Sequence, residues 1–271
     1  MDSLLFALLV GLLQGILEWL PVSSEGAIAL TATVVGGFSP TLATQFGLFL
    51  HAGTGLAALA FYRGDVATLL RSLPEWRPRT AWGRADAELS FLATGTLTSA
   101  VVGGLVYVAL EDLASELTGG AFVAAIGGLL VVTGVVQRVA QERTFDGGRS
   151  PTLGDGVLVG AMQGLALLPG VSRSGTTVSA LLLRGHAGEE TLRLSFLLAI
   201  PASFGAGLLV LVDEGVPAIA LSEAGVALAV SAVVGYLTVG ALVRLVRRVA
   251  FWGVCVGFGA LAVVGGLLVA V

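Results

Sequence analysis

Charged residues are scarce in this chain. Only 12% of its 271 residues are charged, 56% are hydrophobic, and the mean hydropathy is +0.95. These values lie outside the range of soluble globular domains. The composition therefore excludes a soluble enzyme and indicates an integral membrane protein.

Lysine is absent, and cysteine occurs once. All 14 basic residues are arginines, and they form no basic patch with interleaved aromatic residues, so no nucleic acid is expected as a partner. A single cysteine, Cys255, excludes an intramolecular disulfide and a thiolate metal cluster, and we expect it to pack in the core. The first 20 residues lack a basic n-region, and Gln14 and Glu18 interrupt their apolar run. We therefore expect this segment to stay in the mature chain rather than act as a signal peptide.

Several apolar stretches are long enough to cross a membrane. A crossing helix needs about 20 residues, and the stretches do not alternate apolar and polar residues as strands of a lipid-facing barrel do. The sequence thus predicts an all-α integral membrane protein with six transmembrane helices, at residues 43–62, 89–110, 120–137, 194–212, 221–243 and 251–271.

The positions of the arginines predict the orientation, because cytoplasmic loops retain basic residues. Arginines occur in four segments that we expect inside the cell, at 63–84, 138–149, 184–193 and 244–248. Residues 110–120 and 212–217 carry acidic residues and no arginine, so we expect them outside, as we do both termini. His186, in the third arginine-bearing segment, is expected on the solvated surface.

Segment 153–184 is too short for two crossings, although both of its ends are expected inside. Two half-helices that meet at "LPGVSRSG" (168–175) resolve this, because Pro169, Gly170 and Gly175 favour a break. Residues 1–40 repeat the pattern from the other face, with their break at "LPVSSEG" (20–26). Irregular backbone at membrane depth must be buried in protein or line a cavity. We therefore expect two re-entrant helical hairpins whose breaks are the walls of one site.

An internal repeat supports this arrangement. The stretch "LLQGILEWLPVSSEG" (12–26) aligns with "AMQGLALLPGVSRSG" (161–175). At one offset of 149 residues, Gln14 matches Gln163, Gly15 matches Gly164, Ser23 matches Ser172, and Gly26 matches Gly175. Three spans separate the hairpins, so the second half should be inverted. We predict a single membrane domain, 1–271, built as an inverted-topology repeat of halves 1–137 and 153–271 joined by a cytoplasmic loop at 138–152.

The second break carries residues suited to a phosphate group. A half-helix that begins after "SRSG" points unpaired N–H groups and the positive end of its dipole into the cavity. Arg173 adds a guanidinium whose planar fork matches phosphate oxygens. The neighbouring donors expected to bind substrate are Ser172, Ser174, Gly175, Thr176 and Thr177.

The first break adds carboxylates and hydroxyls. On a helix, Gln14 and Glu18 lie four residues apart on one face, and Ser23, Ser24 and Glu25 follow the turn. A carboxylate facing a phosphate can ligate a divalent cation, act as a general acid or base, or pair with Arg173. An ionisable group at membrane depth costs at least ~2.5–3.5 kcal/mol, so we interpret Glu18 and Arg173 as functional.

The remaining polar residues have structural interpretations as well. The side chains of Ser23 and Thr177 can serve close packing at a helix break, and those of Gln14 and Gln163 can hydrogen-bond one helix to another. Glu25 can be a surface acid at the mouth of the site, and His51 an interhelical histidine.

The segments "QGILEWLPVSSEG", "GLALLPGVSRSGTT" and "LSFLLAIPA" resemble the undecaprenyl-diphosphate phosphatase (bacitracin-resistance) family, and the similarity covers essentially the whole chain. This resemblance implies a multi-pass plasma-membrane phosphatase whose active site faces outward. It would hydrolyse a polyisoprenyl diphosphate to the monophosphate carrier lipid and inorganic phosphate, with a divalent cation, Mg²⁺ or Ca²⁺. The expected partners are the lipid substrate and membrane lipids, and a homodimer is a further candidate.

The resemblance also implies roles for individual residues. Glu18 is the essential carboxylate and the candidate metal ligand, and Gln14 stands at a variable substrate-binding position. Ser23 and Ser24 line the site, one of them as a proposed nucleophile. Arg173, with Ser172 and Ser174, would bind the diphosphate. Whether Ser24 or a water molecule attacks phosphorus is left open.

One motif departs from the family pattern. The family commonly has Ser-Ser-Thr-Gly-His, whereas this chain has "SSEGA", with Glu25 for Thr and Ala27 for His. Three explanations remain: the histidine is not essential, Glu25 replaces it, or His51 reaches in from a neighbouring helix. The alternative function is a flippase or transporter of a polyisoprenyl phosphate or another phosphate-bearing substrate, because broken helices in inverted repeats also build transporters.

Overall fold

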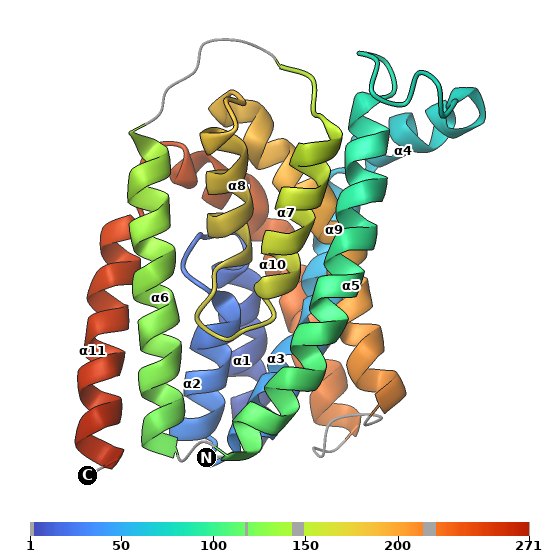
Figure 1. Cartoon of the computed structure of the whole chain (residues 1–271). Coiled ribbons are helices and arrows are strands. Elements are labelled where there is room, and N and C mark those ends of the chain that lie inside the picture. Colours follow the sequence, from blue (N-terminus) through green and yellow to red (C-terminus); the bar gives the residue numbers. More distant parts are fainter. Residues whose placement is uncertain (1–2, 117–118, 143–148, 214–220, 271) are drawn as a thin grey trace.

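A computed structural model describes residues 3–116, 119–142, 149–213 and 221–270 (Figure 1). All regular elements in these ranges are helices. They are α1 (Ser3–Leu17), α2 (Ser24–Val34), α3 (Pro40–Phe61), α4 (Arg63–Ser72), a 3₁₀ turn η1 (Leu73–Glu75), α5 (Ala87–Glu116), α6 (Gly119–Gln141), α7 (Leu153–Leu165), α8 (Arg173–Leu183), α9 (Gly188–Asp213), α10 (Leu221–Val246) and α11 (Trp252–Ala270).

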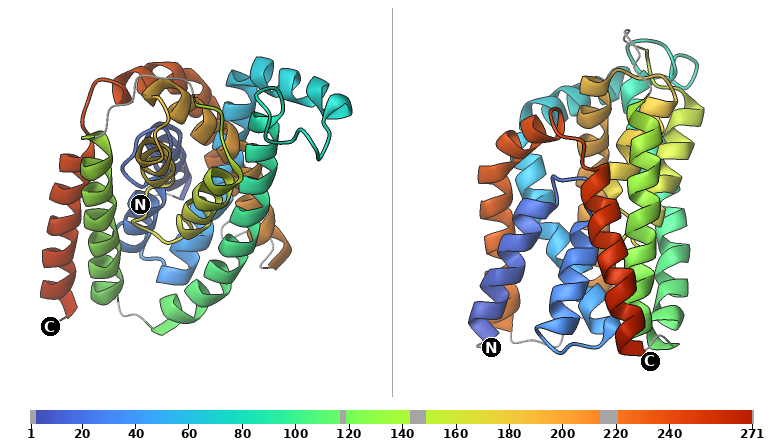
Figure 2. Two further views of the ribbon diagram at one scale, coloured as in Figure 1. Left: turned by 45° about the horizontal axis from the view of Figure 1, so that its top comes forward. Right: turned by 90° about the vertical axis from the view of Figure 1, so that its left-hand side faces the viewer.

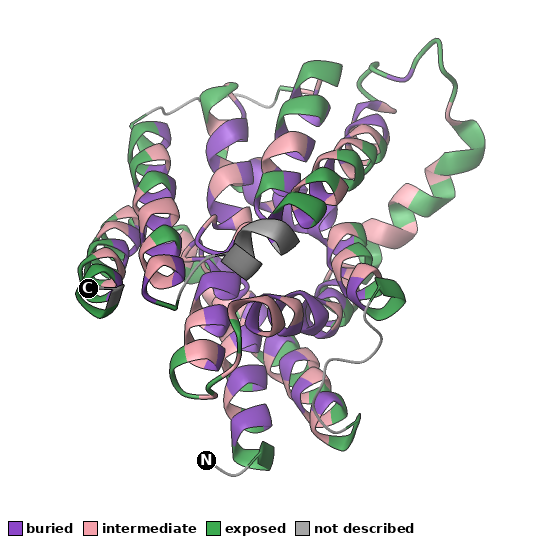
Figure 3. Cartoon of the chain, turned by 60° about the horizontal axis from the view of Figure 1, so that its bottom comes forward, coloured by how far each residue is buried: buried purple, intermediate pink, exposed green. Residues whose placement is uncertain are grey.

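Within the described ranges, six helices are long and apolar enough to cross a membrane: α3, α5, α6, α9, α10 and α11. Each overlaps one predicted stretch, which confirms the all-α multi-pass class. Buried residues face the middle of the bundle, and exposed residues face outward (Figure 3). Outward-facing side chains such as Leu97, Leu105 and Leu237 are about 70% exposed, as expected for a surface that contacts lipid tails.

Several predicted loops are partly helical. Residues 138–141 belong to α6, Arg193 to α9 and Arg244 to α10, and α5 continues through the acidic segment as far as Glu116. Long charged side chains near the ends of a spanning helix can extend to the interface, so hydropathy ends the helix too early. Of segment 212–217, Val212 and Asp213 complete α9, and the other four residues lie outside the described residues.

Helices α1 and α2 form one hairpin, and α7 and α8 form another that starts from the opposite end of the bundle (Figure 1). These helices contain between 11 and 15 residues. At 1.5 Å per residue, none reaches across a hydrocarbon core of about 30 Å. Both turns lie between the two ends of the bundle, and α2 and α8 lie toward its centre (Figure 2). This arrangement is consistent with the predicted re-entrant hairpins.

The arginine-bearing segments lie together at one end of the bundle, which we call the arginine end. It contains α4, the α8–α9 connection and the connection from α10 to α11 (Figure 1). Helix α1 begins and α11 ends at the opposite end. The arginines and the termini therefore separate as the predicted orientation requires.

Packing of the two halves is consistent with an inverted repeat. Helix α1 packs against α10, whereas its repeat counterpart α7 packs against α5, the counterpart of α10. Gly11 and Gly160 share the offset of the repeat, and each lets its half-helix approach a neighbour closely. A Cβ atom added to Gly11 would lie 2.6 Å from the carbonyl oxygen of Ala227. A Cβ atom added to Gly160 would lie 2.5 Å from the carbonyl oxygen of Gly95. The repeat therefore includes a packing glycine one turn before the motif.

The beginning of α7 is anchored by a buried carboxylate at the arginine end, outside the six spans. Asp155 Oδ2 accepts hydrogen bonds from Thr152 N (2.8 Å) and Oγ1 (2.7 Å), and Oδ1 accepts one from Arg184 Nε (2.6 Å). His186 is fully buried, with Nε2 3.3 Å from Asp155 Oδ2. The prediction of a solvated His186 is therefore wrong, because the α8–α9 connection folds over the Asp155 carboxylate.

The Asp155→Asn substitution should destabilise the protein in a pH-dependent manner. Burial alone would raise the pKa of Asp155, but hydrogen bonds from Arg184 and Thr152 lower this pKa to about 2. Since the unfolded value is about 3.9, the stabilisation is complete above about pH 5 and is lost as the pH falls toward 2. We expect thermal unfolding in detergent to show a loss of ~2 kcal/mol at pH 7.

That loss should become much smaller at pH 3, and an equal loss at both pH values would contradict this account. Glu189→Gln is the control, because the Glu189 side chain is 79% exposed and its ion pair should contribute little.

The Gly127→Ala substitution should destabilise the contact between α6 and α11. A Cβ atom at Gly127 would lie 2.5 Å from the Gly259 carbonyl oxygen, so the two backbones would have to separate. We expect the free energy of unfolding in detergent to fall by ~1–3 kcal/mol, the usual cost of overpacking. Gly128→Ala on the same helix is the control, because a Cβ atom at Gly128 would have no neighbouring atom of the described residues within 4 Å. This substitution should be neutral or slightly stabilising. Equal behaviour of the two variants would show that this close approach is absent.

Candidate active site

The turns of the two hairpins meet inside the bundle. Arg173 Nη2, at the start of α8, donates a hydrogen bond to Glu18 Oε1, just after α1. Gly170 N donates to Ser23 Oγ (3.1 Å), and Ser174 Oγ donates to the Leu20 carbonyl oxygen (3.3 Å). The structure thus brings the two predicted motifs together.

Glu18 is at the centre of the contacts between these turns. Its Oε2 accepts hydrogen bonds from Ser24 Oγ (2.6 Å) and Gln14 Nε2 (3.0 Å), and His51 Nε2 lies 3.4 Å away. Gln14 Nε2 also lies 3.5 Å from Thr54 Oγ1. Both carboxylate oxygens are therefore engaged, one by Arg173 and the other by polar neighbours.

The repeat provides two matching helix caps. Ser23 Oγ accepts a hydrogen bond from Gly26 N (3.1 Å), and Ser172 Oγ accepts one from Gly175 N (3.2 Å). The identical residues of the motif therefore cap the N-termini of α2 and α8. Side-chain caps of this kind leave other N–H groups of the first turn available for an anion.

Ser23 has a strained backbone. Its φ is 63°, the only positive value among the described residues other than glycine. Such a conformation costs of order 1–3 kcal/mol and persists where neighbouring contacts hold it. Because its Oγ accepts two backbone N–H groups, Ser23 joins the turns, whereas Ser24 Oγ points its proton at a carboxylate.

Arg173 has an unused donor. Its Nη1 atom is buried and has no hydrogen-bond partner in the described part of the chain. Glu25 is buried as well, and its Oε2 atom likewise lacks a partner there. Both residues line a cavity of about 10 Å³ that also touches Glu18, Ser24 and His51. A space this small holds about one water molecule.

The predicted substrate-binding residues divide into two groups. Ser172 and Ser174 line this cavity. Gly175 and Thr176 are not among its lining residues, because Gly175 N serves the cap and Thr176 Oγ1 donates back to the Ser172 carbonyl oxygen (2.9 Å). Thr177 Oγ1 likewise donates to the Arg173 carbonyl oxygen and contacts Ser195. The threonines therefore support α8 rather than face the cavity.

The sequence left open whether His51, Glu25, Gln14 and Gln163 belong to the site or only to helix packing. The structure distinguishes these residues by whether they reach the cavity or Glu18. His51 and Glu25 both reach the cavity, and His51 Nδ1 lies 2.9 Å from the Gly47 carbonyl oxygen, which orients its ring. Gln14 contacts Glu18, but Gln163 Nε2 donates to Ser99 Oγ and the Leu198 carbonyl oxygen. Gln163 therefore joins neighbouring helices, whereas Gln14, its counterpart in the repeat, contacts the carboxylate of the site.

Sequence reasoning missed the residues that hold the turns in place. On α6, Thr133 Oγ1 donates to the Gly170 carbonyl oxygen (3.3 Å), and Gln137 Nε2 donates to that of Pro21 (2.7 Å). Cys255 is buried as expected, and its Sγ also donates to Pro21 (3.0 Å). The available signal was a threonine and a glutamine four residues apart, on one face of an apolar span.

A divalent cation was expected to bind Glu18. No group of three or more His, Cys, Asp and Glu side chains that could hold a metal occurs among the described residues. Mg²⁺ commonly takes only one or two carboxylates and completes its shell with water and substrate phosphates. Glu25 can supply such a carboxylate ligand, because its Oε2 atom has no hydrogen-bond partner among the described residues. Both oxygens of Glu18 are already engaged.

Comparison with known proteins gives consistent results. The family model described as "Bacitracin resistance protein BacA" matches residues 7–264. A relative named "Undecaprenyl-diphosphatase" from Haloarcula marismortui is 59% identical over 270 residues, covering 100% of both chains. Relatives of the same name from Methanopyrus kandleri and Methanococcoides burtonii are 41% and 36% identical, and the alignments cover 93–98% of the chains.

Proposed function

This chain belongs to the bacitracin resistance protein BacA family, and on that basis we propose that it hydrolyses undecaprenyl diphosphate or a similar polyisoprenyl diphosphate. The products are the lipid monophosphate and inorganic phosphate. The observation that carries the proposal is the buried contact of Arg173 with Glu18 between two half-helix N-termini, with Ser24 on the same carboxylate.

Substrate binding begins with an exchange of partners at Arg173. The cavity of about 10 Å³ is too small for a diphosphate, so side chains must move to admit one. A diphosphate can replace Glu18 as the anionic partner of Arg173, whose Nη1 donor is still free. The N–H groups at the start of α8 and the hydroxyls of Ser172 and Ser174 then bind the remaining oxygens. These fixed donors stabilise charge on the transferring phosphoryl group.

Release of Arg173 leaves Glu18 free to act as a general base. The Ser24 hydroxyl gives its proton to Glu18, and Ser24 Oγ forms a bond to the terminal phosphorus as the bond from that phosphorus to the bridging oxygen breaks. The lipid monophosphate leaves with the bridging oxygen. A water molecule then attacks the phosphorus of the phosphoserine and gives a proton to His51, which lies beside Glu18. The bond from phosphorus to Ser24 Oγ breaks, protonated Glu18 returns its proton to that oxygen, and inorganic phosphate leaves. Ser24 is proposed as the nucleophile because its hydroxyl lies 2.6 Å from the base.

We place a divalent cation, Mg²⁺ or Ca²⁺, beside Glu25. When bound, the cation neutralises charge on the phosphate oxygens. In this assignment Glu25, rather than Glu18, is the carboxylate that ligates the cation directly. Ala27 stands where the family commonly has a histidine. In this proposal Glu25 occupies the space of that histidine, but it binds the cation and does not transfer a proton.

EDTA should abolish most of the activity, and added Mg²⁺ should restore it. We expect Glu25→Gln to raise the Mg²⁺ concentration for half-maximal activity by about tenfold or more, as loss of a ligand or of its support commonly does. His51→Ala is the comparison, because His51 lies against Glu18 and should lower kcat without shifting the Mg²⁺ requirement. An unchanged Mg²⁺ requirement in Glu25→Gln would refute this assignment.

Oxygen-18 tracing tests the reaction itself. Purified protein is incubated with undecaprenyl diphosphate in H₂¹⁸O, and both products are analysed by mass spectrometry. Attack on the terminal phosphorus puts the label in inorganic phosphate and none in the lipid monophosphate. Label in the lipid product, or recovery of intact diphosphate, would overturn the proposal.

The proposal extends to the placement of the protein. The arginine end faces the cytoplasm of a plasma-membrane protein, the catalytic site takes its substrate from outside, and two copies form a homodimer. Hydrolysis of a membrane-impermeant diphosphate by right-side-out vesicles tests whether the catalytic site is open to the outside.

The molecular mass of the protein in detergent, measured by light scattering, tests the homodimer.

A further inference from the structure

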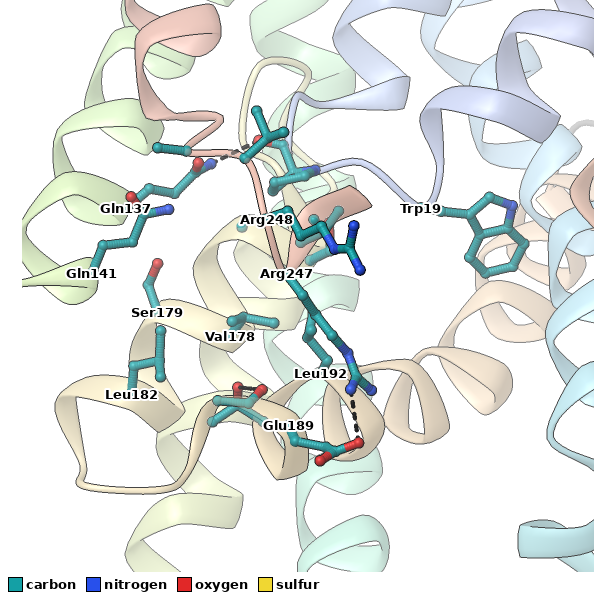
Figure 4. Close-up of a pocket in the computed structure, with 18 residues that line it drawn as sticks. Trp19, Gln137, Gln141, Val178, Ser179, Leu182, Glu189, Leu192, Arg247 and Arg248 are labelled. Carbon is teal, nitrogen blue, oxygen red and sulfur yellow. Dashed lines mark hydrogen bonds and ion pairs between the residues drawn. The ribbon is translucent and has the colours of Figure 1, made fainter. Parts of the chain in front are cut away.

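A second, much larger cavity lies at the arginine end. Its volume is about 600 Å³, within the ~300–1,000 Å³ range of ligand pockets. Its walls come from the ends of α6 and α10, from α8, and from the beginning of α9 (Figure 4). The catalytic reaction described above does not use this space.

The cavity reaches the back of the catalytic turns. Ser174 and Gly175, in the first turn of α8, line it, and so do Trp19 and Pro21, which flank Leu20 just after Glu18. Ser174 lines both this cavity and the small catalytic cavity. The two spaces therefore adjoin each other at Ser174 and the turn after Glu18.

The charge of the cavity favours an anion. Arg247 and Arg248 both line it. Among the described residues Glu189 is the one lining carboxylate, and it pairs with Arg247 Nη1 at 2.7 Å (Figure 4). Arg248 has no side-chain hydrogen bond or ion pair anywhere in the described ranges, and in Figure 4 its guanidinium extends among the lining residues. One cationic fork is therefore free for a ligand.

Part of the remaining wall is apolar. Val178, Leu182, Leu192 and Val249 line it together with the polar residues Gln141 and Ser179. A phosphate group alone would use only the arginines and the polar groups. The apolar part matches the first isoprene units of a lipid.

We propose that this arginine-end cavity is a binding site for a phosphate monoanion or dianion, formed around Arg248, that receives a product of the reaction. The inference rests on the proposed function, because that reaction yields two such ligands, inorganic phosphate and the headgroup of a polyisoprenyl monophosphate. Both offer the same phosphate oxygens to Arg248, and the apolar wall discriminates between them.

Direct binding to catalytically silent protein tests the site. In an Arg173→Ala background, which removes the catalytic phosphate cradle, we measure binding of labelled orthophosphate and of farnesyl monophosphate in detergent. At least one probe should bind. Adding Arg248→Gln should weaken that binding at least tenfold, whereas adding Arg244→Gln should leave it unchanged. Arg244 lies four residues earlier, in the last turn of α10, and is exposed like Arg248, but it does not line the cavity. Failure of both probes to bind, or equal effects of the two arginine substitutions, would overturn the proposal.

The two probes identify the source of the phosphate. If farnesyl monophosphate binds at least tenfold tighter than orthophosphate, the ligand is the lipid headgroup, since the apolar wall contributes. Equal affinities assign the site to free phosphate. Hydrolysis by the wild-type chain is measured separately, so binding without hydrolysis would refute only the proposed function. Hydrolysis without binding would refute only this site.

A labelling experiment applies if the Arg173→Ala chain does not fold. Gln141→Cys places a thiol in the cavity wall, while the buried Cys255 of the parent chain gives the background. The bound probe should slow modification of the new thiol by a charged thiosulfonate at least fivefold. Protection should disappear on adding Arg248→Gln and persist on adding Arg244→Gln. If neither phosphate probe changes the rate at which the thiol of Gln141→Cys is modified, the proposed site is refuted.

Discussion

Arg173→Ala is expected to lower the rate of diphosphate hydrolysis by at least ~10³-fold, within the range measured for arginines that stabilise phosphoryl transfer. The variant loses the one arginine among the described residues that line the catalytic cavity, together with its buried, unused Nη1 donor. Arg173→Lys keeps a positive charge but not the planar fork, and should recover only part of the rate. The measurement is initial phosphate release at saturating substrate.

Loss of Arg173 also affects stability, which has to be separated from catalysis. Glu18 would be left as a buried charge without its partner, a change that typically costs 3–5 kcal/mol. Adding Glu18→Gln to Arg173→Ala removes that charge and should restore much of the thermal stability. Activity should not return. A folded Arg173→Ala chain that keeps the wild-type rate would contradict a direct role for Arg173.

Ser24→Ala is expected to have an effect of similar size, ~10³-fold or more, because it removes the nucleophile. Ser23→Ala is the matched control on the neighbouring residue. Ser23 accepts two backbone N–H groups, so its loss should lower stability by ~1 kcal/mol or more and reduce activity much less. Initial rates and thermal unfolding are measured on both variants.

A double-variant comparison checks whether Ser24 and Glu18 act together. If Glu18 takes the proton of Ser24, then Ser24→Ala combined with Glu18→Gln should be scarcely worse than either single change. Multiplicative losses would show that the two residues act independently. A Ser24→Ala chain that keeps more than about a tenth of its activity would identify water as the nucleophile.

The repeated residues explain why much of the site could be predicted. Ser23 with Gly26 and Ser172 with Gly175 are identical in both halves, and each pair forms the same helix cap. Glycine, proline and serine specify a broken helix through local backbone preferences, which a sequence displays directly. The ionisable pair, Glu18 and Arg173, was visible because charge at membrane depth requires an explanation.

Contacts between distant segments could not be predicted in the same way. The approach of His51 to Glu18 and the hydrogen bond from Gln137 to Pro21 depend on how α3 and α6 pack around the hairpins. His186 was expected in solvent because its segment is polar, yet the fold buries it beside Asp155. The arginine-end cavity arises from the ends of several helices together, so no single motif indicates it.

Phosphate release from undecaprenyl diphosphate by the purified wild-type chain in detergent tests the central claim most directly. Inorganic phosphate and lipid monophosphate are both counted. The account predicts one inorganic phosphate for each lipid monophosphate formed, and a rate that Arg173→Ala reduces by at least ~10³-fold. Folded protein that binds the lipid and releases no phosphate would contradict it, and would favour a flippase or transporter that uses the same pair of turns.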